Sequence, residues 1–232
     1  MENLKPNEQR AKTVLILLWI VLSVEIISLV SYIFQYLLLQ SVANGEGVSE
    51  EAAANNDLRQ RVIGIVYVLF YIVSGITFIM WFRRAYFNLH TKIKHLSFNE
   101  GWAAGAWFVP VIALFRPYQI MKELYYETEI LLSSKLDYYT PVLNRNYLGI
   151  WWALWIISSF LGQFVFRYSL KANTVDELLT VTTASIINSL IGIPLGLITI
   201  KIVKDYSSVE LFLFELKEET TSEKISPGQS TF

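Results

Sequence analysis

The sequence predicts an all-α membrane protein with four transmembrane helices, and three observations support this fold class. The 232 residues are 53% hydrophobic and only 17% charged, whereas soluble domains are about 25% charged. The apolar residues gather in four long blocks that charged stretches separate. Each block supplies the roughly 20 helical residues needed to cross a hydrocarbon core about 30 Å thick. Backbone groups in lipid must bond to one another, so the blocks are predicted to be helices.

The four predicted spans are residues 13–39, 62–82, 147–168 and 181–203. The first contains a single charged residue, Glu25, and the second contains none. The first block is too long for a signal peptide and no small-residue cleavage site follows it, so we expect it to be retained. Ser49 precedes two glutamates in the manner of a helix start, so the second helix is expected to begin before its apolar part.

The distribution of basic residues predicts the orientation of the spans. With both termini and the long connection 83–146 on one side, that side carries all but four of the 19 Lys and Arg residues. The four on the other side are Arg59, Arg61, Arg167 and Lys171. Because basic residues favour the cytoplasmic side of a membrane, both termini are predicted to be cytoplasmic. This gives an N-terminal arm (1–12), one membrane domain (13–205) and a cytoplasmic tail (206–232), whose end has a composition typical of disorder.

The long connection contains two further predicted elements. Residues 101–116 consist of the apolar stretch 101–115 followed by Arg116, but a helix over 101–115 reaches only about 22 Å and Pro110 would break or kink it. We therefore expect a re-entrant or interfacial segment, and the alternative is a fifth, kinked span. Residues 118–138 place apolar side chains at three- and four-residue steps among charged ones, which predicts an amphipathic helix on the cytoplasmic face, with Pro117 in its first turn.

Several motifs in this region resemble one protein family. They are Arg84-Ala85-Tyr86-x-Asn88, Gly101-Trp102-Ala103-x-Gly105-x-Trp107-Phe108-x-Pro110, Pro117-Tyr118-Gln119, and Trp151-Trp152-Ala153-Leu154-Trp155. Over about residues 60–205 the chain resembles the DUF4328 family of bacterial integral membrane proteins, a domain of unknown function. Ala113 departs from the asparagine that the family often has after the proline. The resemblance implies a multi-pass protein of the bacterial inner membrane, and it implies no activity.

Glu25 is the first candidate for a functional residue, because it lies near the middle of the first span. An ionisable group at that depth costs a few kcal/mol unless it is paired or hydrated. Polar residues at similar depth in the other spans predict a buried layer of Glu25, Tyr71, Ser158, Ser159 and Asn188. The layer could be a proton, cation or polar-substrate site, or it could consist of hydrogen bonds that hold the helices together.

Small residues line one face of the fourth span, at Ser185, Ser189, Gly192 and Gly196. Such a face lets helix backbones approach closely, and we expect it to pack against the third span. A hinge or a dimer face is the alternative. The residues Gly101, Trp102, Gly105, Trp107, Pro110 and Pro117 are expected to anchor and pack the interfacial segment.

The sequence also bears on what the protein does. It has no cysteine and only two histidines, and no catalytic motif is recognised, so we expect no enzyme activity, no metal and no cofactor. A structural, regulatory or scaffold bundle is the leading hypothesis, and a small transporter or channel that uses Glu25 is the alternative. The expected partners are the lipid bilayer, a second copy of the chain, and a cytoplasmic protein bound through 118–138. The net charge of −1 does not favour nucleic acid.

Overall fold

The computed structural model describes residues 4–216, and within this range the chain is helical and contains no strand. Its elements are, in chain order, α1 (Glu8–Ala43), α2 (Glu50–Lys92), α3 (Trp102–Gly105), the 3-10 turns η1 (Ala106–Phe108) and η2 (Ile112–Leu114), α4 (Arg116–Lys135), α5 (Asn146–Ser169) and α6 (Val175–Glu210). The predicted all-α fold is therefore confirmed.

Four helices of the described chain, α1, α2, α5 and α6 with its continuation to Leu216, are long and apolar enough to cross a membrane. Each predicted span lies inside one of them. Helix α2 starts at Glu50, before its apolar part, and the Ser49 hydroxyl caps it by accepting the backbone N–H of Ala52 at 3.1 Å. A side-chain oxygen there satisfies one of the N–H groups that a helix start leaves unpaired. Helix α6 continues through Pro194.

The described residues form two compact units. We call residues 14–76 and 149–201 the span unit, and residues 4–13, 77–148 and 202–216 the connection unit. Helices α1, α2 and α6 contribute residues to both units. The predicted disorder from Lys217 onward lies outside the described residues.

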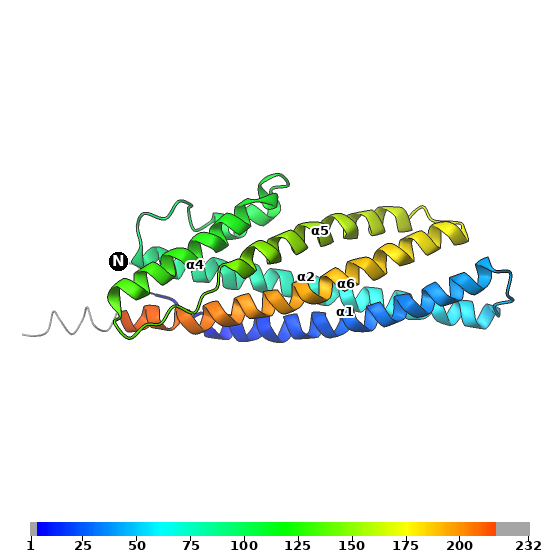
Figure 1. The fold of residues 1–232 in the computed structure, drawn as a ribbon, viewed down its shortest axis with the longest axis horizontal. Coiled ribbons are helices and arrows are strands. Elements are labelled where there is room, and N and C mark those ends of the chain that lie inside the picture. The colour runs from blue at the N-terminus through cyan, green and yellow to red at the C-terminus, as the bar shows by residue number, and fades with distance from the viewer. Residues whose placement is uncertain (1–3, 217–232) are drawn as a thin grey trace, which may run out of the picture. The chain divides into compact units, whose positions relative to one another are not determined.

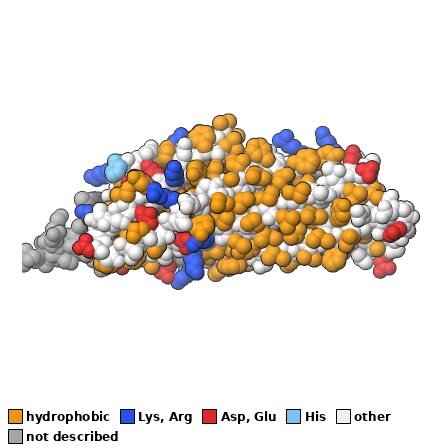
Figure 2. Space-filling model, in the orientation of Figure 1, with side chains coloured by type: hydrophobic (Ala, Val, Ile, Leu, Met, Phe, Trp, Pro, Cys, Tyr) orange, Lys and Arg blue, Asp and Glu red, His pale blue; other side chains and the backbone are white. Residues whose placement is uncertain are grey.

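The span unit consists of helices that lie side by side (Figure 1) and present apolar side chains outward. Large side chains such as Ile16, Leu69 and Phe160 are more than half exposed. Hydrophobic side chains cover much of the helical surface in Figure 2. A helix that is apolar all round suits a lipid environment, so the outward faces of these helices suit contact with lipid.

The connection unit has an aromatic core. Trp81, Tyr86, Tyr125 and Tyr206 are almost completely buried. The Tyr206 ring stacks on that of Tyr125 with centroids 5.9 Å apart, and it meets Trp81 edge-on at 6.1 Å. These contacts join α2, α4 and α6, so the buried face of α4 packs against the chain's own helices.

The segment predicted to be re-entrant or interfacial does not form one continuous helix. It consists of α3, η1 and η2, with an extended residue, Val109, between the two 3-10 turns. The residue before a proline avoids the helical region, and Val109 precedes Pro110. The segment exposes apolar side chains at its turn, since Phe108 is 75% exposed and Val111 is 70% exposed.

Candidate functional site: the polar layer around Glu25

Glu25 lies inside the span unit, with only 6% of its surface exposed. It belongs to α1, and it is hydrogen-bonded to the hydroxyl groups of Ser189 on α6 and Tyr67 on α2. One carboxyl group therefore joins three helices. Such interhelical polar contacts contribute about 0.6 kcal/mol on average, and up to about 1.7 kcal/mol.

Gly192 makes room for this carboxyl group. A Cβ atom at position 192 would lie 3.1 Å from Oε1 of Glu25 and 3.2 Å from its Cδ. One helical turn further along α6, a Cβ at Gly196 would lie 3.3 Å from Cδ1 of Leu22. Helix α1 therefore packs against the small face of α6 at these two glycines, where we expected α5 to pack.

Helix α5 meets α6 at a different residue of the predicted layer. The Ser158 hydroxyl donates a hydrogen bond to Oδ1 of Asn188 at 3.0 Å. The amide nitrogen of Asn188 is 4.0 Å from the position of a Cβ on Gly162. Residues of the predicted layer therefore take part in two contacts, one around Glu25 and one between Ser158 and Asn188.

The other predicted residues of the layer and of the small face differ in their exposure and contacts. Tyr71 is 53% exposed and stacks on Tyr67, with ring centroids 5.8 Å apart. Ser159 is half-buried. The hydroxyl of Ser185 is buried and donates to the carbonyl of Val181, at 2.9 Å. The tyrosine that reaches Glu25 is therefore one turn away from the one we selected.

Further interhelical hydrogen bonds hold the helices of the span unit together at other positions along their length. Gln35 on α1 donates to the hydroxyl of Thr182 on α6 at 3.1 Å. The Trp151 indole N–H on α5 donates to the hydroxyl of Thr199 on α6 at 3.0 Å. The Arg59 side chain on α2 donates to the hydroxyl of Ser31 on α1 at 3.0 Å.

The connection unit contains a second buried carboxylate, which sequence reasoning missed. Glu210 is 3% exposed and accepts hydrogen bonds from the side-chain amides of Asn7, at 2.9 Å, and Asn88, at 2.7 Å. Asn88 also exchanges two hydrogen bonds with the backbone of Lys5, at 3.0 and 2.9 Å. This cluster fastens residues 5–7 to α2 and α6. The sequence contained little sign of this cluster, and the only hint was that Asn88 belongs to one of the family motifs.

Helix α4 is held to α6 by hydrogen bonds as well as by ring stacking. The Tyr125 hydroxyl donates to the carbonyl of Ile202 at 3.0 Å, and Thr128 is hydrogen-bonded to the Tyr206 hydroxyl at 3.2 Å. Burial raises the pKa of the Tyr125 phenol, so this hydroxyl stays protonated and remains a donor at neutral pH.

The predicted anchor residues fall into two groups by exposure. Pro117 is buried in the first turn of α4. Trp107 meets Phe78 of α2 edge-on, with centroids 5.9 Å apart. Trp102 is 40% exposed and Pro110 is exposed, while Gly101 and Gly105 lie at the two ends of α3. Trp107 packs the segment against α2, and the exposed Trp102 and Pro110 leave an apolar surface.

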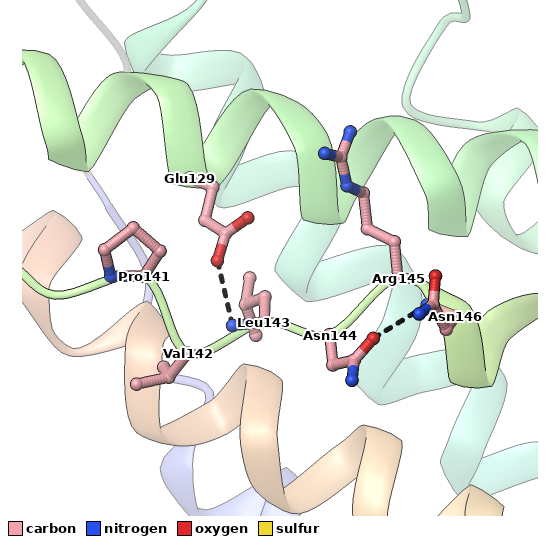
Figure 3. A pocket seen from close by; sticks show the side chains of 7 residues that line it. All are labelled: Glu129, Pro141, Val142, Leu143, Asn144, Arg145 and Asn146. Carbon is pink, nitrogen blue, oxygen red and sulfur yellow. Dashed lines mark hydrogen bonds between the residues drawn. The ribbon is translucent and has the colours of Figure 1, made fainter.

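A shallow hollow of about 310 Å³ lies beside α4, between Glu129 and residues 141–146. Its polar groups are used by the chain itself (Figure 3). The Glu129 carboxylate accepts the backbone N–H of Leu143 at 2.9 Å, and Asn144 accepts the N–H of Asn146 at 2.9 Å. These bonds stabilise the loop that leads to α5, so we assign the polar groups of the hollow a structural role.

Comparisons with known proteins agree with the family resemblance. No curated protein and no solved structure matches the chain. Residues 44–208 match the family described as "Domain of unknown function (DUF4328)", which covers α2 to α6, including Asn88 and the aromatic motifs. Since this match extends over most of the chain, the protein belongs to the DUF4328 family.

Proposed function

We propose that the protein is a structural scaffold of the membrane, whose intramembrane polar groups serve to bind its helices to one another. The single observation that carries this proposal is the arrangement of Glu25. Its carboxyl group is engaged by the hydroxyls of Tyr67 and Ser189 and lies against Gly192. A polar group spent in this way on neighbouring helices adds to the stability of the bundle.

The proposed orientation places both termini and the connection unit on the cytoplasmic side of a bacterial inner membrane. The distribution of Lys and Arg supports the side, and the resemblance to a bacterial family supports the membrane. The exposed apolar turn at Phe108 and Val111 would then lie at the membrane interface, where an apolar surface is stabilised by contact with acyl chains.

A cytoplasmic partner would bind the more exposed face of α4. Tyr126 and Ile130 are 45% and 46% exposed and lie four residues apart, so they share one face of the helix. The opposite face of α4 is buried, through residues such as Leu124 and Thr128. A scaffold that is fixed in the membrane by its spans and presents such a face can hold a soluble protein at the membrane surface.

The scaffold proposal is tested against transport in proteoliposomes. We expect the wild-type protein to carry no proton or alkali-cation flux above that of protein-free liposomes. The Glu25→Leu variant is expected to unfold at lower denaturant, because it loses two interhelical hydrogen bonds and leaves Ser189 without its acceptor. A flux in the wild type that Glu25→Gln abolishes, while the variant remains folded, would contradict the proposal and favour transport.

A further inference from the structure

Three arginine side chains lie close together in the connection unit. Nη1 of Arg10, on α1, donates to the backbone carbonyl of Met80, on α2, at 3.2 Å. In an α-helix the carbonyl of residue 80 points toward the N–H of residue 84. Arg10 therefore lies beside the turn of α2 that carries Arg83 and Arg84, and the charges of Arg10 and Arg83 both act on Arg84.

The carboxylates near these arginines do not neutralise them. Arg83 reaches Glu100 at 3.4 Å, but both side chains are partly exposed, so this pair is weak. Within residues 4–216 neither Arg10 nor Arg84 forms an ion pair with a carboxylate. Glu210 attracts Arg84, although its oxygens are already occupied by two asparagine amides. The cluster thus keeps an excess of positive charge.

The position of the arginines in the sequence matches the boundary of the hydrocarbon core. In α1 the next charged residue after Lys12 is Glu25, and in α2 the residues between Arg61 and Arg83 carry no charge. Basic residues at the ends of such runs lie at the level of the lipid headgroups. Met80, whose carbonyl accepts the hydrogen bond from Arg10, is 47% exposed and adds apolar surface beside the arginines.

We propose that Arg10, Arg83 and Arg84 bind the headgroup phosphate of an anionic phospholipid. Guanidinium groups form paired hydrogen bonds with phosphate oxygens, and a shared anion relieves the repulsion between neighbouring cations. The apolar surface of Met80 would contact the start of an acyl chain. A lipid bound in this way would do more than solvate the protein. Its headgroup would link the beginning of α1 to the end of the apolar part of α2.

The test is lipid-dependent thermal unfolding of the full chain in detergent. Phosphatidylglycerol and phosphatidylcholine with identical acyl chains are titrated separately, and inorganic phosphate is titrated at matched ionic strength. We expect phosphatidylglycerol to raise the unfolding temperature of the wild type at lower concentration than phosphatidylcholine does. A basic residue near an anionic lipid surface contributes about 1 kcal/mol, so Arg10→Gln and Arg84→Gln should each weaken the preference about fivefold.

Arg61→Gln is the matched control, because Arg61 is an exposed arginine on the same helix at the other end of the charge-free run. This variant should keep the full preference for phosphatidylglycerol. An equal response of the wild type to the two lipids would overturn the proposal. So would an undiminished preference in Arg10→Gln, whose folding the unfolding curve itself verifies. A response to inorganic phosphate equal to that to phosphatidylglycerol would assign the site to free anions instead of lipid.

Discussion

Replacing Gly192 with alanine tests the close contact between α1 and α6. The added Cβ would lie 3.1 Å from Oε1 and 3.2 Å from Cδ of Glu25, which is a few tenths of an ångström shorter than ordinary contact. The carboxyl group would have to move, and its hydrogen bonds with Ser189 and Tyr67 would be strained.

The expected magnitude follows from two opposing effects. Overpacking of a tight contact costs about 1–3 kcal/mol, and alanine in a helix gains about 0.5–1 kcal/mol over glycine. The net change in unfolding free energy should be a loss of about 1 kcal/mol. Gly75→Ala is the control, because nothing lies within 4 Å of its added Cβ. This control should be neutral or stabilising.

The assay is reversible unfolding in mixed micelles of dodecylmaltoside and dodecyl sulfate, followed by circular dichroism. A double-mutant cycle with Glu25→Ala isolates the contact, since the cycle measures how far two substitutions depend on each other. We expect Gly192→Ala to lose its cost in the Glu25→Ala background. If Gly192→Ala behaves like Gly75→Ala in both backgrounds, the described contact between the helices is wrong.

The other two predictions concern the hydroxyl partner of Glu25 and the fastening of the N-terminal arm. Tyr67→Phe should lower the unfolding free energy by about 1 kcal/mol because it removes a hydrogen bond to the carboxyl group of Glu25. Tyr71→Phe alters an exposed ring and should change the unfolding free energy by less than about 0.5 kcal/mol. Equal effects of the two substitutions in the same micelle assay would contradict the assignment of Tyr67 as the partner of Glu25. Asn88→Ala should cost about 2–3 kcal/mol, since it releases Lys5 and removes a donor from a buried carboxylate, and limited proteolysis should then cut near residue 5 faster than in the wild type. An arm that remains equally protected would show that other contacts hold it.

Much of the fold could be predicted from the sequence because lipid imposes simple constraints. Apolar blocks of the right length identify the four helices, and the Ser49 start signal placed the beginning of α2. The sequence did not show that α2 continues beyond its apolar part as far as Lys92. Tyr206 is buried among contacts with Tyr125 of α4 and Trp81 of α2, and a hydropathy pattern carries no information about such contacts.

The candidate site was predictable at the level of Glu25 but not at the level of its partners. Helical spacing places Tyr67 and Tyr71 on the same side of α2, and only the relative rotation of α1 and α2 decides which of them reaches the carboxyl group. The glycine face of α6 was visible, but the neighbour that fills it was not, because both α1 and α5 offer polar and small residues. Glu210 escaped notice because a glutamate in a charged tail is normally solvated, and here two asparagines from distant segments bury it.

The scaffold proposal depends on the connection unit lying on the cytoplasmic side, and single-cysteine labelling in cells tests this orientation most directly. The chain has no cysteine of its own, so Glu46→Cys, in the connection between α1 and α2, and Thr140→Cys, between α4 and α5, each report one exposed position. We predict that a membrane-impermeant maleimide labels Glu46→Cys in intact cells and labels Thr140→Cys only after permeabilisation. Labelling of Thr140→Cys in intact cells would contradict it.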